Sequence, residues 1–391
     1  MKEIRLIALN ITLLFLGNPC FSQDTLIQEL LIDNTLQFNF NGKEFKGDGW
    51  DYIQNEVRES SNVLLGEDHF SNEIPLFTKA IFDIKSFDNF FIEVDPYSAE
   101  IIVESIQDSI NQKEFHENYK DLFSFYALKP EFDLLEHIVK SGTNVLGADQ
   151  IVAYADRLIF NNLKNKSKND TARQIYSDIT EQSKLHLDAF LSDPRNPMYF
   201  MTAKFEHQLN MIDSLSISSE EKVIIEEIRK SISIYKSGGH TKRIQLIKHH
   251  LMKNYPAWKN SQNLFKYGAM HMSRGESFLT IYDIGNMVAN IAESSYEKSY
   301  HIMVIGETGM KGAPFRTFPP SEVNIESGMM RDLKIFFDIT TSKEDWYLFN
   351  LLPIRQAVNS GEIKIENITL TRVIKGYDSL VIIPKLTPAK F

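Results

Sequence analysis

The feature that most constrains the fold is an alternation of short apolar runs with long amphipathic segments. A short run without polar alternation fits a strand buried on both faces, as in a parallel sheet. Between the runs, apolar residues recur at helical spacing. The expected strands are Asn62 to Leu65, Phe90 to Val94, Asn144 to Leu146, Leu264 to Tyr267, His301 to Ile305 and Leu380 to Ile383. The pattern predicts an α/β fold with a central, mostly parallel sheet covered by helices.

The middle of the chain, residues 130–255, is almost wholly helical in pattern. We expect this stretch to form a large helical insertion or cap over the sheet. No Pro-rich or Ser-rich linker divides the sequence. Residues 23–391 are therefore predicted to form a single domain.

Capping residues and glycines predict where individual helices begin and end. Asp95-Pro96 follows an expected strand and reads as an N-cap with proline at the first helical position. Gly238-Gly239 is expected to end one helix and Thr241 to cap the next. The glycine-rich segment from Gly306 to Gly312 lacks the Gly-Lys-Ser/Thr ending of a phosphate loop and is expected to be a mobile surface loop.

The first 22 residues have the pattern of a secretory signal. Lys2 and Arg5 precede an apolar stretch from Leu6 to Gly17, and small or polar residues follow up to Ser22. A retained membrane anchor is the alternative, but this stretch is shorter than the roughly 20 residues of a spanning helix. We therefore expect a periplasmic or secreted protein, without stable membrane insertion after removal of the signal.

Cys20 is the only cysteine, and it lies within the predicted signal. After cleavage the protein would contain no disulfide, no cysteine nucleophile and no zinc–thiolate site. Lipid attachment at Cys20 is the alternative. Pro19, directly before it, argues against a lipid anchor, because a small residue normally stands there.

The acidic balance of the sequence narrows the class of partner. The formal charge is −10, and loss of Lys2, Glu3 and Arg5 with the signal would make it −11. Such a charge disfavours nucleic acid and anionic membranes. A neutral or cationic small molecule fits better as a substrate, and the oligomeric state stays open.

Two similar segments indicate where function resides. Gly66-Glu67-Asp68-His69 and Gly268-Ala269-Met270-His271 each follow an expected buried strand, about 200 residues apart. Ligand sites in open α/β sheets lie at the carboxyl ends of the strands. His69 and His271 could therefore share one cleft, although a single histidine after a strand is more often structural.

Several carboxylates could serve these histidines. Glu67 and Glu73 are both close enough in sequence to orient His69, provided that the following helix begins by residue 70. Glu93 closes a neighbouring strand and could point into the same cleft, or simply cap the next turn. Asp149 follows a third strand, where it could equally be a routine N-cap.

Other candidate motifs are weaker. His249 and His250 are adjacent on a predicted amphipathic helix, where neighbouring side chains point apart, so a structural role is expected. The Gly-x-Ser-x-Gly pattern of the serine hydrolase elbow is absent from the sequence.

The order of these motifs resembles that of erythromycin-esterase-like proteins, a superfamily that includes the haem-binding ChaN-like lipoproteins and the TraB and TIKI proteins. The segments that carry the resemblance are Leu64 to His69, Phe91-Ile92-Glu93, Gly147-Ala148-Asp149, Arg243 and Tyr377 to Ile383. Erythromycin esterases usually place the first histidine one residue further from Gly-Glu, whereas the spacing here is closer to ChaN. The paired Gly-x-x-His segments are similar to the TraB and TIKI pattern.

The resemblance implies an α/β fold with a cleft that contains His69, His271, Glu93 and Arg243. The leading hypothesis is a hydrolase of small esters, lactones or amides. In it His69, oriented by Glu67 or Glu73, activates a water that Glu93 orients, and His271 and Arg243 stabilise the oxyanion.

Three alternatives remain. A divalent metal could be held by His69, His271 and Glu93, as in a TIKI-like peptidase, because histidine and carboxylate are common zinc ligands. A haem or small-ligand binding protein, with Met270 and Met272 beside the histidines, is the weaker cofactor hypothesis. The third is a non-catalytic fold whose helical middle is a partner surface.

Overall fold

The computed structural model describes residues 23–108 and 112–391, and the predicted signal with Cys20 lies outside this range. The described residues form one ten-stranded sheet with the order β2-β1-β9-β10-β7-β3-β6-β4-β5, and β8 pairs with β7. The strands are β1 (Thr35–Phe40), β2 (Phe45–Lys46), β3 (Asn62–Glu67), β4 (Asn89–Ile92), β5 (Asn144–Gly147), β6 (Asn263–Gly268), β7 (Ser299–Lys311), β8 (Ser321–Glu322), β9 (Trp346–Asn350) and β10 (Ser379–Leu386).

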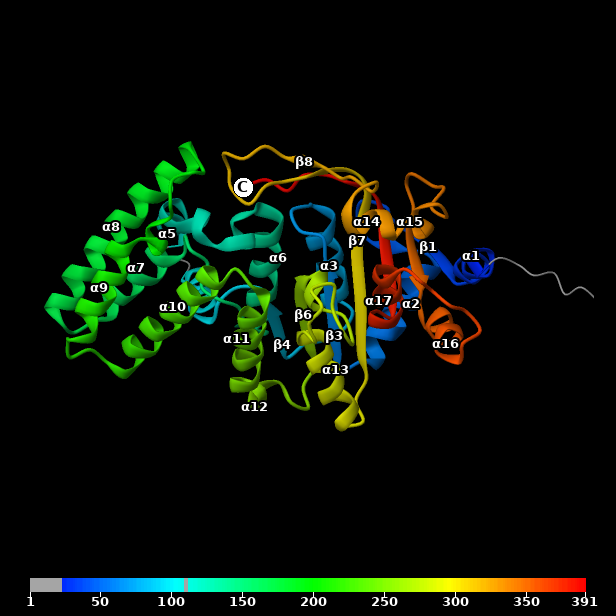
Figure 1. The fold of residues 1–391 in the computed structure, drawn as a ribbon, viewed down its shortest axis with the longest axis horizontal. Coiled ribbons are helices and arrows are strands. Elements are labelled where there is room, and N and C mark those ends of the chain that lie inside the picture. Colours follow the sequence, from blue (N-terminus) through cyan, green and yellow to red (C-terminus); the bar gives the residue numbers. More distant parts are fainter. Residues whose placement is uncertain (1–22, 109–111) are drawn as a thin grey trace, which may run out of the picture.

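Helices cover both faces of the sheet and extend beyond one edge (Figure 1). The α-helices are α1 (Gln23–Asp33), α2 (Asp48–Glu59), α3 (Glu73–Phe82), α4 (Pro96–Gln107), α5 (Gln112–Tyr119), α6 (Lys129–Lys140), α7 (Asp156–Lys166), α8 (Asp170–Ser192), α9 (Ala203–Asp213), α10 (Ser219–Ser237), α11 (His240–Lys253), α12 (Tyr255–Trp258), α13 (Ile284–Ser294), α14 (Gly328–Asp332), α15 (Lys334–Phe337), α16 (Leu352–Ser360) and α17 (Ile368–Gly376). Short 3₁₀ turns are η1 (Lys120–Leu122), η2 (Ser124–Ala127), η3 (Tyr199–Met201) and η4 (Ala269–His271).

The centre of the sheet is parallel, and one edge is antiparallel. β10, β7, β3, β6, β4 and β5 run in the same direction. β9 pairs antiparallel with β10, and β1 pairs antiparallel with β9. The prediction of a mostly parallel sheet covered by helices is confirmed.

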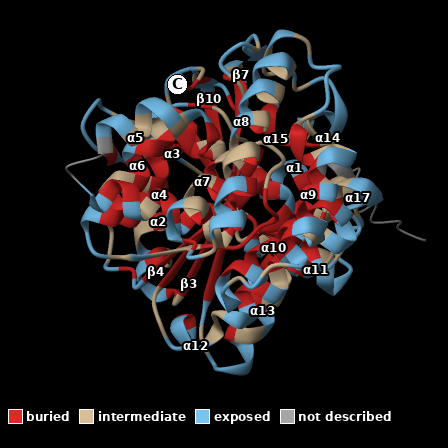
Figure 2. Cartoon of the chain, turned by 90° about the vertical axis from the view of Figure 1, so that its left-hand side faces the viewer, coloured by how far each residue is buried: buried red, intermediate tan, exposed pale blue. Residues whose placement is uncertain are grey.

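Both faces of the central strands are buried, which explains their uninterrupted apolar runs. In β3, Val63 and Leu65 belong to one hydrophobic cluster and Leu64 to the cluster on the opposite face. This alternation follows from the two-residue period of a strand. Figure 2 shows the strands as a buried interior beneath largely exposed helix surfaces.

The helical part formed by α7 to α10 lies beyond the β5 edge (Figure 1). The β7–β8 connection and the C-terminal tail cross the top of the view towards it. The Phe315 ring lies 5.4 Å from that of Phe190 on α8, and Arg316 pairs with Asp121 at 2.5 Å. The Phe315 contact joins the β7–β8 connection to the helical part, and the Arg316 contact joins it to η1.

All six expected strands are present, although most boundaries differ by a few residues. Asp95 caps α4 as predicted, because its side chain accepts from the backbone N–H of Tyr97 and Ser98. Gly238, with φ of 63°, ends α10. Thr241 is not the cap of α11, which begins at His240 after Gly239.

The segment from Gly306 to Lys311 is not a loop, because β7 continues through it and pairs with both β10 and β8. The expected helical middle is interrupted by β5, which belongs to the central sheet. Among the described residues, no helix combines the length and the apolar character of a bilayer span.

Candidate active site

The sheet register brings the two Gly-x-x-His segments together. β3 and β6 are adjacent and parallel, with Gly66 opposite Tyr267 and Glu67 opposite Gly268. Because both strands end at the same edge, His69 and His271 arrive in the same region. β4 lies on the other side of β6 and brings Glu93 to that edge. The expected convergence of these three residues is therefore present.

Glu93 is the centre of this cluster. Its Oε2 lies 3.7 Å from His69 Nε2, and its Oε1 lies 3.6 Å from His271 Nε2. The Gly268 N–H donates to Oε2 at 2.7 Å, and Arg243 donates to Oε1 at 2.7 Å. Burial alone would raise the pKa of Glu93, but the positive charges of His271 and Arg243 outweigh it and hold this pKa at about 2. Glu93 is thus an ionised carboxylate between two imidazoles.

His69 forms one imidazole–carboxylate dyad. Its Nδ1 lies 2.7 Å from Glu67 Oε1, and its ring stacks on Phe125 with centroids 4.2 Å apart. The side chain is 22% exposed, whereas that of Glu67 is 2% exposed. Burial lowers the pKa of His69, but Glu67 and the charge of Glu93 together raise it, so the net shift is upward. With Nδ1 bound to Glu67, the Nε2 atom is left to face Glu93.

His271 forms a second dyad with Asp283. The Nδ1–Oδ2 distance is 2.9 Å, and the two side chains are 5% and 0% exposed. Burial lowers the pKa of His271, but the hydrogen bond to Asp283 and the charge of Glu93 raise it overall. Asp283 also caps α13, since it accepts from the Ile284 N–H. Sequence reasoning missed Asp283, although its place before an apolar helix marks it as an N-cap.

Arg243 reaches the cluster from α11 and is held by two acids. Its guanidinium donates to Asp149 Oδ1 at 2.9 Å and Oδ2 at 2.6 Å, besides the bond to Glu93. Asp149 follows β5 and is buried. The pairing with Arg243 gives Asp149 a role that its position alone left open. Because Arg243 is 20% exposed, part of its head group remains open to solvent.

A further buried ion chain lies behind His69. Lys266 Nζ on β6 is 2.6 Å from Glu67 Oε2 and 2.8 Å from Glu131 Oε1 on α6. Burial raises the pKa of Glu131 to about 7, although Lys266 opposes that shift. Sequence reasoning missed both residues. The signal that could have found Lys266 is a lysine inside the apolar run from Leu264 to Tyr267.

Gly268 is required by the close packing of the site. A Cβ at this position would lie 2.9 Å from His69 Nε2 and 3.5 Å from Glu93 Oε2. The backbone φ of −53° is open to any residue, so the constraint is space and not conformation. The glycine of the second motif therefore leaves room for the histidine of the first.

Glu73 does not join the cluster. Its carboxylate accepts from the backbone N–H and hydroxyl of Thr387, and no hydrogen bond or ion pair among the described residues links it to His69. The helix does not begin by residue 70, because Phe70 adopts a φ of 76° and α3 begins at Glu73. Glu67, and not Glu73, orients His69.

The remaining sequence candidates have other surroundings. Met272 is fully buried in the core, whereas Met270 is 43% exposed, so they do not line a common pocket wall with the histidines. His250 is buried against Glu227 at 3.1 Å, in agreement with the structural role expected for it. Within the described ranges, no group of three or more His, Cys, Asp or Glu residues has an arrangement that could hold a metal ion.

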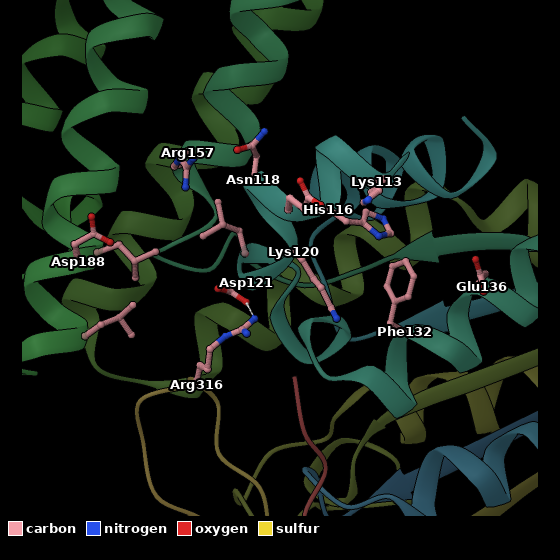
Figure 3. A pocket seen from close by; sticks show the side chains of 14 residues that line it. Lys113, His116, Asn118, Lys120, Asp121, Phe132, Glu136, Arg157, Asp188 and Arg316 are labelled. Carbon is pink, nitrogen blue, oxygen red and sulfur yellow. Dashed lines mark hydrogen bonds and ion pairs between the residues drawn. The ribbon is translucent and has the colours of Figure 1, made fainter. Parts of the chain in front are cut away.

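A separate pocket of about 660 Å³ is lined by residues of α5, η1, α6, α7 and α8 together with Arg316 (Figure 3). Charged residues of both signs line it, among them Lys120, Asp121, Arg157 and Arg316. The same short segment that supplies Lys120 and Asp121 also carries Phe125, the ring that stacks on His69. The pocket and the histidine cluster are therefore linked through residues 120–127, although neither histidine lines the pocket.

Solved structures of low sequence identity share this fold. A protein from Bacillus cereus has a TM-score of 0.52 and 14% identity, over 94% of this chain and 98% of its own. A mutant of the erythromycin esterase EreC in its open conformation has a TM-score of 0.57 and 15% identity, over 88% and 96%. A succinoglycan biosynthesis protein has a TM-score of 0.53 and 12% identity, over 94% and 98%. The chain therefore has an erythromycin-esterase-like fold.

Comparisons at the level of sequence add nothing to this result. No family model matches the chain, and no curated protein matches it.

Proposed function

We propose that this protein is a hydrolase of a small ester, lactone or amide, and that the His69–Glu67 dyad activates the attacking water. The observation that carries the proposal is the convergence of two imidazole–carboxylate dyads on Glu93, beside a partly open arginine. The erythromycin-esterase-like fold supports it, because one protein with this fold is an erythromycin esterase.

In this proposal each group has a distinct task. With its Nδ1–H donated to Glu67, neutral His69 has a lone pair on Nε2 that takes a proton from water. The water oxygen then bonds to the carbonyl carbon, and the developing oxyanion is stabilised by the Arg243 guanidinium. As the carbon–oxygen or carbon–nitrogen bond breaks, the leaving group recovers the proton from His69.

Glu93 and His271 hold this arrangement in place. Glu93 fixes the Arg243 head group and faces both Nε2 atoms, so it also orients a water near His69. His271 is almost completely buried, and its Nε2 faces Glu93. We therefore assign His271 to the support of Glu93 and not to direct contact with the oxyanion, which revises the sequence-based hypothesis.

The metal-dependent variant considered from the sequence, with His69, His271 and Glu93 as ligands, does not fit the structure, because no group of three or more His, Cys, Asp or Glu among the described residues is arranged to hold a metal ion. In the present arrangement Arg243 already supplies a positive charge at Glu93, and both Nδ1 atoms are bound to carboxylates. Turnover is therefore expected to be insensitive to a chelator, and a loss of turnover on addition of chelator would contradict this assignment.

The first 22 residues lead us to propose export to the periplasm or the exterior, where the substrate would be met. Mass spectrometry of the N-terminus of the protein expressed in a Gram-negative host tests this. A mature N-terminus near residue 23 is expected, and an intact N-terminus in the cytoplasm would contradict export.

The activity is tested with a panel of esters, lactones and amides, with and without chelator. The panel is run on the wild type, His69→Ala and Glu73→Gln. We expect hydrolysis of at least one class, a loss of roughly 100-fold or more in folded His69→Ala, and normal turnover in Glu73→Gln. Unchanged turnover in folded His69→Ala would rule out His69 as the base.

A further inference from the structure

The residues behind His69 form a buried chain of alternating charge. Glu131, Lys266 and Glu67 have side chains that are 4%, 2% and 2% exposed. Lys266 contacts both carboxylates, and Glu67 in turn contacts His69. The chain runs from α6 through the middle of the sheet to the proposed base.

Such a chain is costly to bury and is not needed for packing. Lys266 lies within a fully buried strand, and its face of that strand, shared with Leu264, borders a hydrophobic cluster. Replacing buried ion pairs with well-packed apolar residues is often neutral or stabilising. Stability alone therefore does not explain why a lysine stands in the central strand β6.

We propose that Lys266 is a positioning residue for His69: by neutralising Glu67 it keeps Glu67 as a hydrogen-bond acceptor without forcing the imidazole to carry the compensating charge. The proposal rests on the function proposed above, since a base must be neutral to accept a proton at Nε2. Glu131 completes the arrangement, because it holds Lys266 between two carboxylates.

Lys266 can have this effect because the charges of buried side chains must balance one another where solvent does not screen them. Glu67 requires a cation nearby, and among the described residues two candidates form ion pairs with it, His69 and Lys266. If Lys266 were absent, the imidazolium would be the sole partner, and His69 would remain protonated to a higher pH. Lys266 removes that requirement and leaves the tautomer with Nδ1–H donated to Glu67.

Other groups near His69 do not take over this task. Glu93 faces Nε2 and favours the imidazolium, while Phe125 covers one side of the ring. Tyr126, the residue after Phe125, is also buried. Arg243 and His271 both contact the other carboxylate oxygen of Glu93, Oε1. On the neighbouring strand, Lys311 is paired with Asp68 at 2.9 Å.

The second dyad provides an internal contrast. Asp283 contacts His271, and no lysine or arginine among the described residues forms an ion pair with it. His271 is therefore the sole cation available to Asp283 and is suited to remain charged beside Glu93. Only the dyad with the more exposed histidine has a lysine behind it.

The test is an NMR pH titration of the histidine ring carbons in the intact chain. The His69 signal is assigned by its absence from His69→Ala. We expect the pKa of His69 to rise by about one unit or more in Lys266→Met, and to stay near the wild-type value in Lys266→Arg. Lys311→Met, which breaks the Lys311–Asp68 pair, is the matched control and should leave the His69 pKa nearly unchanged.

A second variant guards against misfolding of Lys266→Met. In Lys266→Met/Glu131→Gln, one positive and one negative charge are removed together, and the same upward shift of His69 is expected. An unchanged or lower His69 pKa in either folded variant would overturn the proposal. Because the titration needs no substrate, it is independent of the hydrolysis panel: a shift without hydrolysis would retain the electrostatic effect and reject the catalytic one.

Discussion

The two Gly-x-x-His segments reach the same edge of the sheet, but they place their histidines in different surroundings. His69 is 22% exposed, stacks on an aromatic ring and is backed by a glutamate that also contacts a lysine. His271 is 5% exposed and is backed by an aspartate that caps a helix. Similar local sequences thus produce one accessible histidine and one enclosed histidine.

We infer from this difference that His69 takes part in the reaction and that His271 supports the site. A group that accepts a proton from water must be reachable and must become neutral near the working pH. A group that stabilises a buried carboxylate is most effective when it is itself buried and positively charged. We infer that the role of each histidine depends on the carboxylate bound to its Nδ1 atom. It also depends on whether that carboxylate contacts a second cation.

The largest effect on this contrast is expected from Gly268→Ala. The added Cβ would lie 2.9 Å from His69 Nε2 and displace the ring from Glu93. A misplacement of this size should lower kcat/KM by roughly 100-fold with little loss of stability, because the backbone accepts alanine. Gly66→Ala is the comparison variant, since its Cβ would meet Ala269 and Met272 in the core and should reduce stability instead. Near-normal kcat/KM in Gly268→Ala would argue against the tight approach of His69 and Glu93.

The pH dependence of hydrolysis should report on His69. Its pKa is raised above the ordinary value of 6.5, and the neutral form is the active base. We therefore expect kcat/KM to rise with pH through a midpoint above 6.5, changing about tenfold per pH unit on the acid side. Glu67→Gln should move the midpoint downward, because the neutral amide no longer favours the imidazolium. An unchanged midpoint in Glu67→Gln would mean that the His69–Glu67 dyad does not control the reaction.

Asp283→Asn should act mainly on stability. The raised pKa of His271 means that its charged form is favoured in the folded state, so the stabilisation is complete below the unfolded pKa and is lost as pH rises through the folded pKa. Removing the acid should lower the free energy of unfolding by about 1–3 kcal/mol at low pH, and by less at high pH. Urea unfolding at pH 5.5 and 9 measures both values, and a loss that grows with pH would contradict the assignment.

Glu73→Gln should have the smallest effect. Its carboxylate accepts from Thr387 at the surface, and the amide oxygen retains one acceptor there. We expect a change in stability within about 0.5 kcal/mol and no change in kcat/KM. A loss of activity comparable to that of Glu67→Gln would mean that both acids serve His69.

Local sequence pattern was enough to predict the parallel core of the fold and the arrival of the two histidines at the same edge of the sheet. The central strands are apolar because both faces are buried, and the register of β3 and β6 follows from their similar ends. Strands β1 and β9, in the antiparallel part of the sheet, were missed. In β1, polar Gln37 and Asn39 alternate with apolar residues, and only Phe38 is fully covered.

The partners of the site residues were harder to predict because folding, and not spacing, brings them together. Arg243 binds Glu93 across 150 positions of the sequence, and Lys266 binds Glu131 across 135. Glu73 was expected near His69 because the helix was expected to begin earlier. The left-handed backbone at Phe70 delays α3 and turns Glu73 away.

The most direct test of the account is a parallel measurement of kcat/KM and unfolding free energy for the wild type, His69→Ala and His271→Ala, on a substrate that the panel identifies. The account predicts that His69→Ala loses roughly 100-fold or more in kcat/KM with little change in stability, whereas His271→Ala loses stability because Asp283 is left buried without its partner. If folded His69→Ala retained wild-type kcat/KM, the assignment of His69 as the base would be wrong.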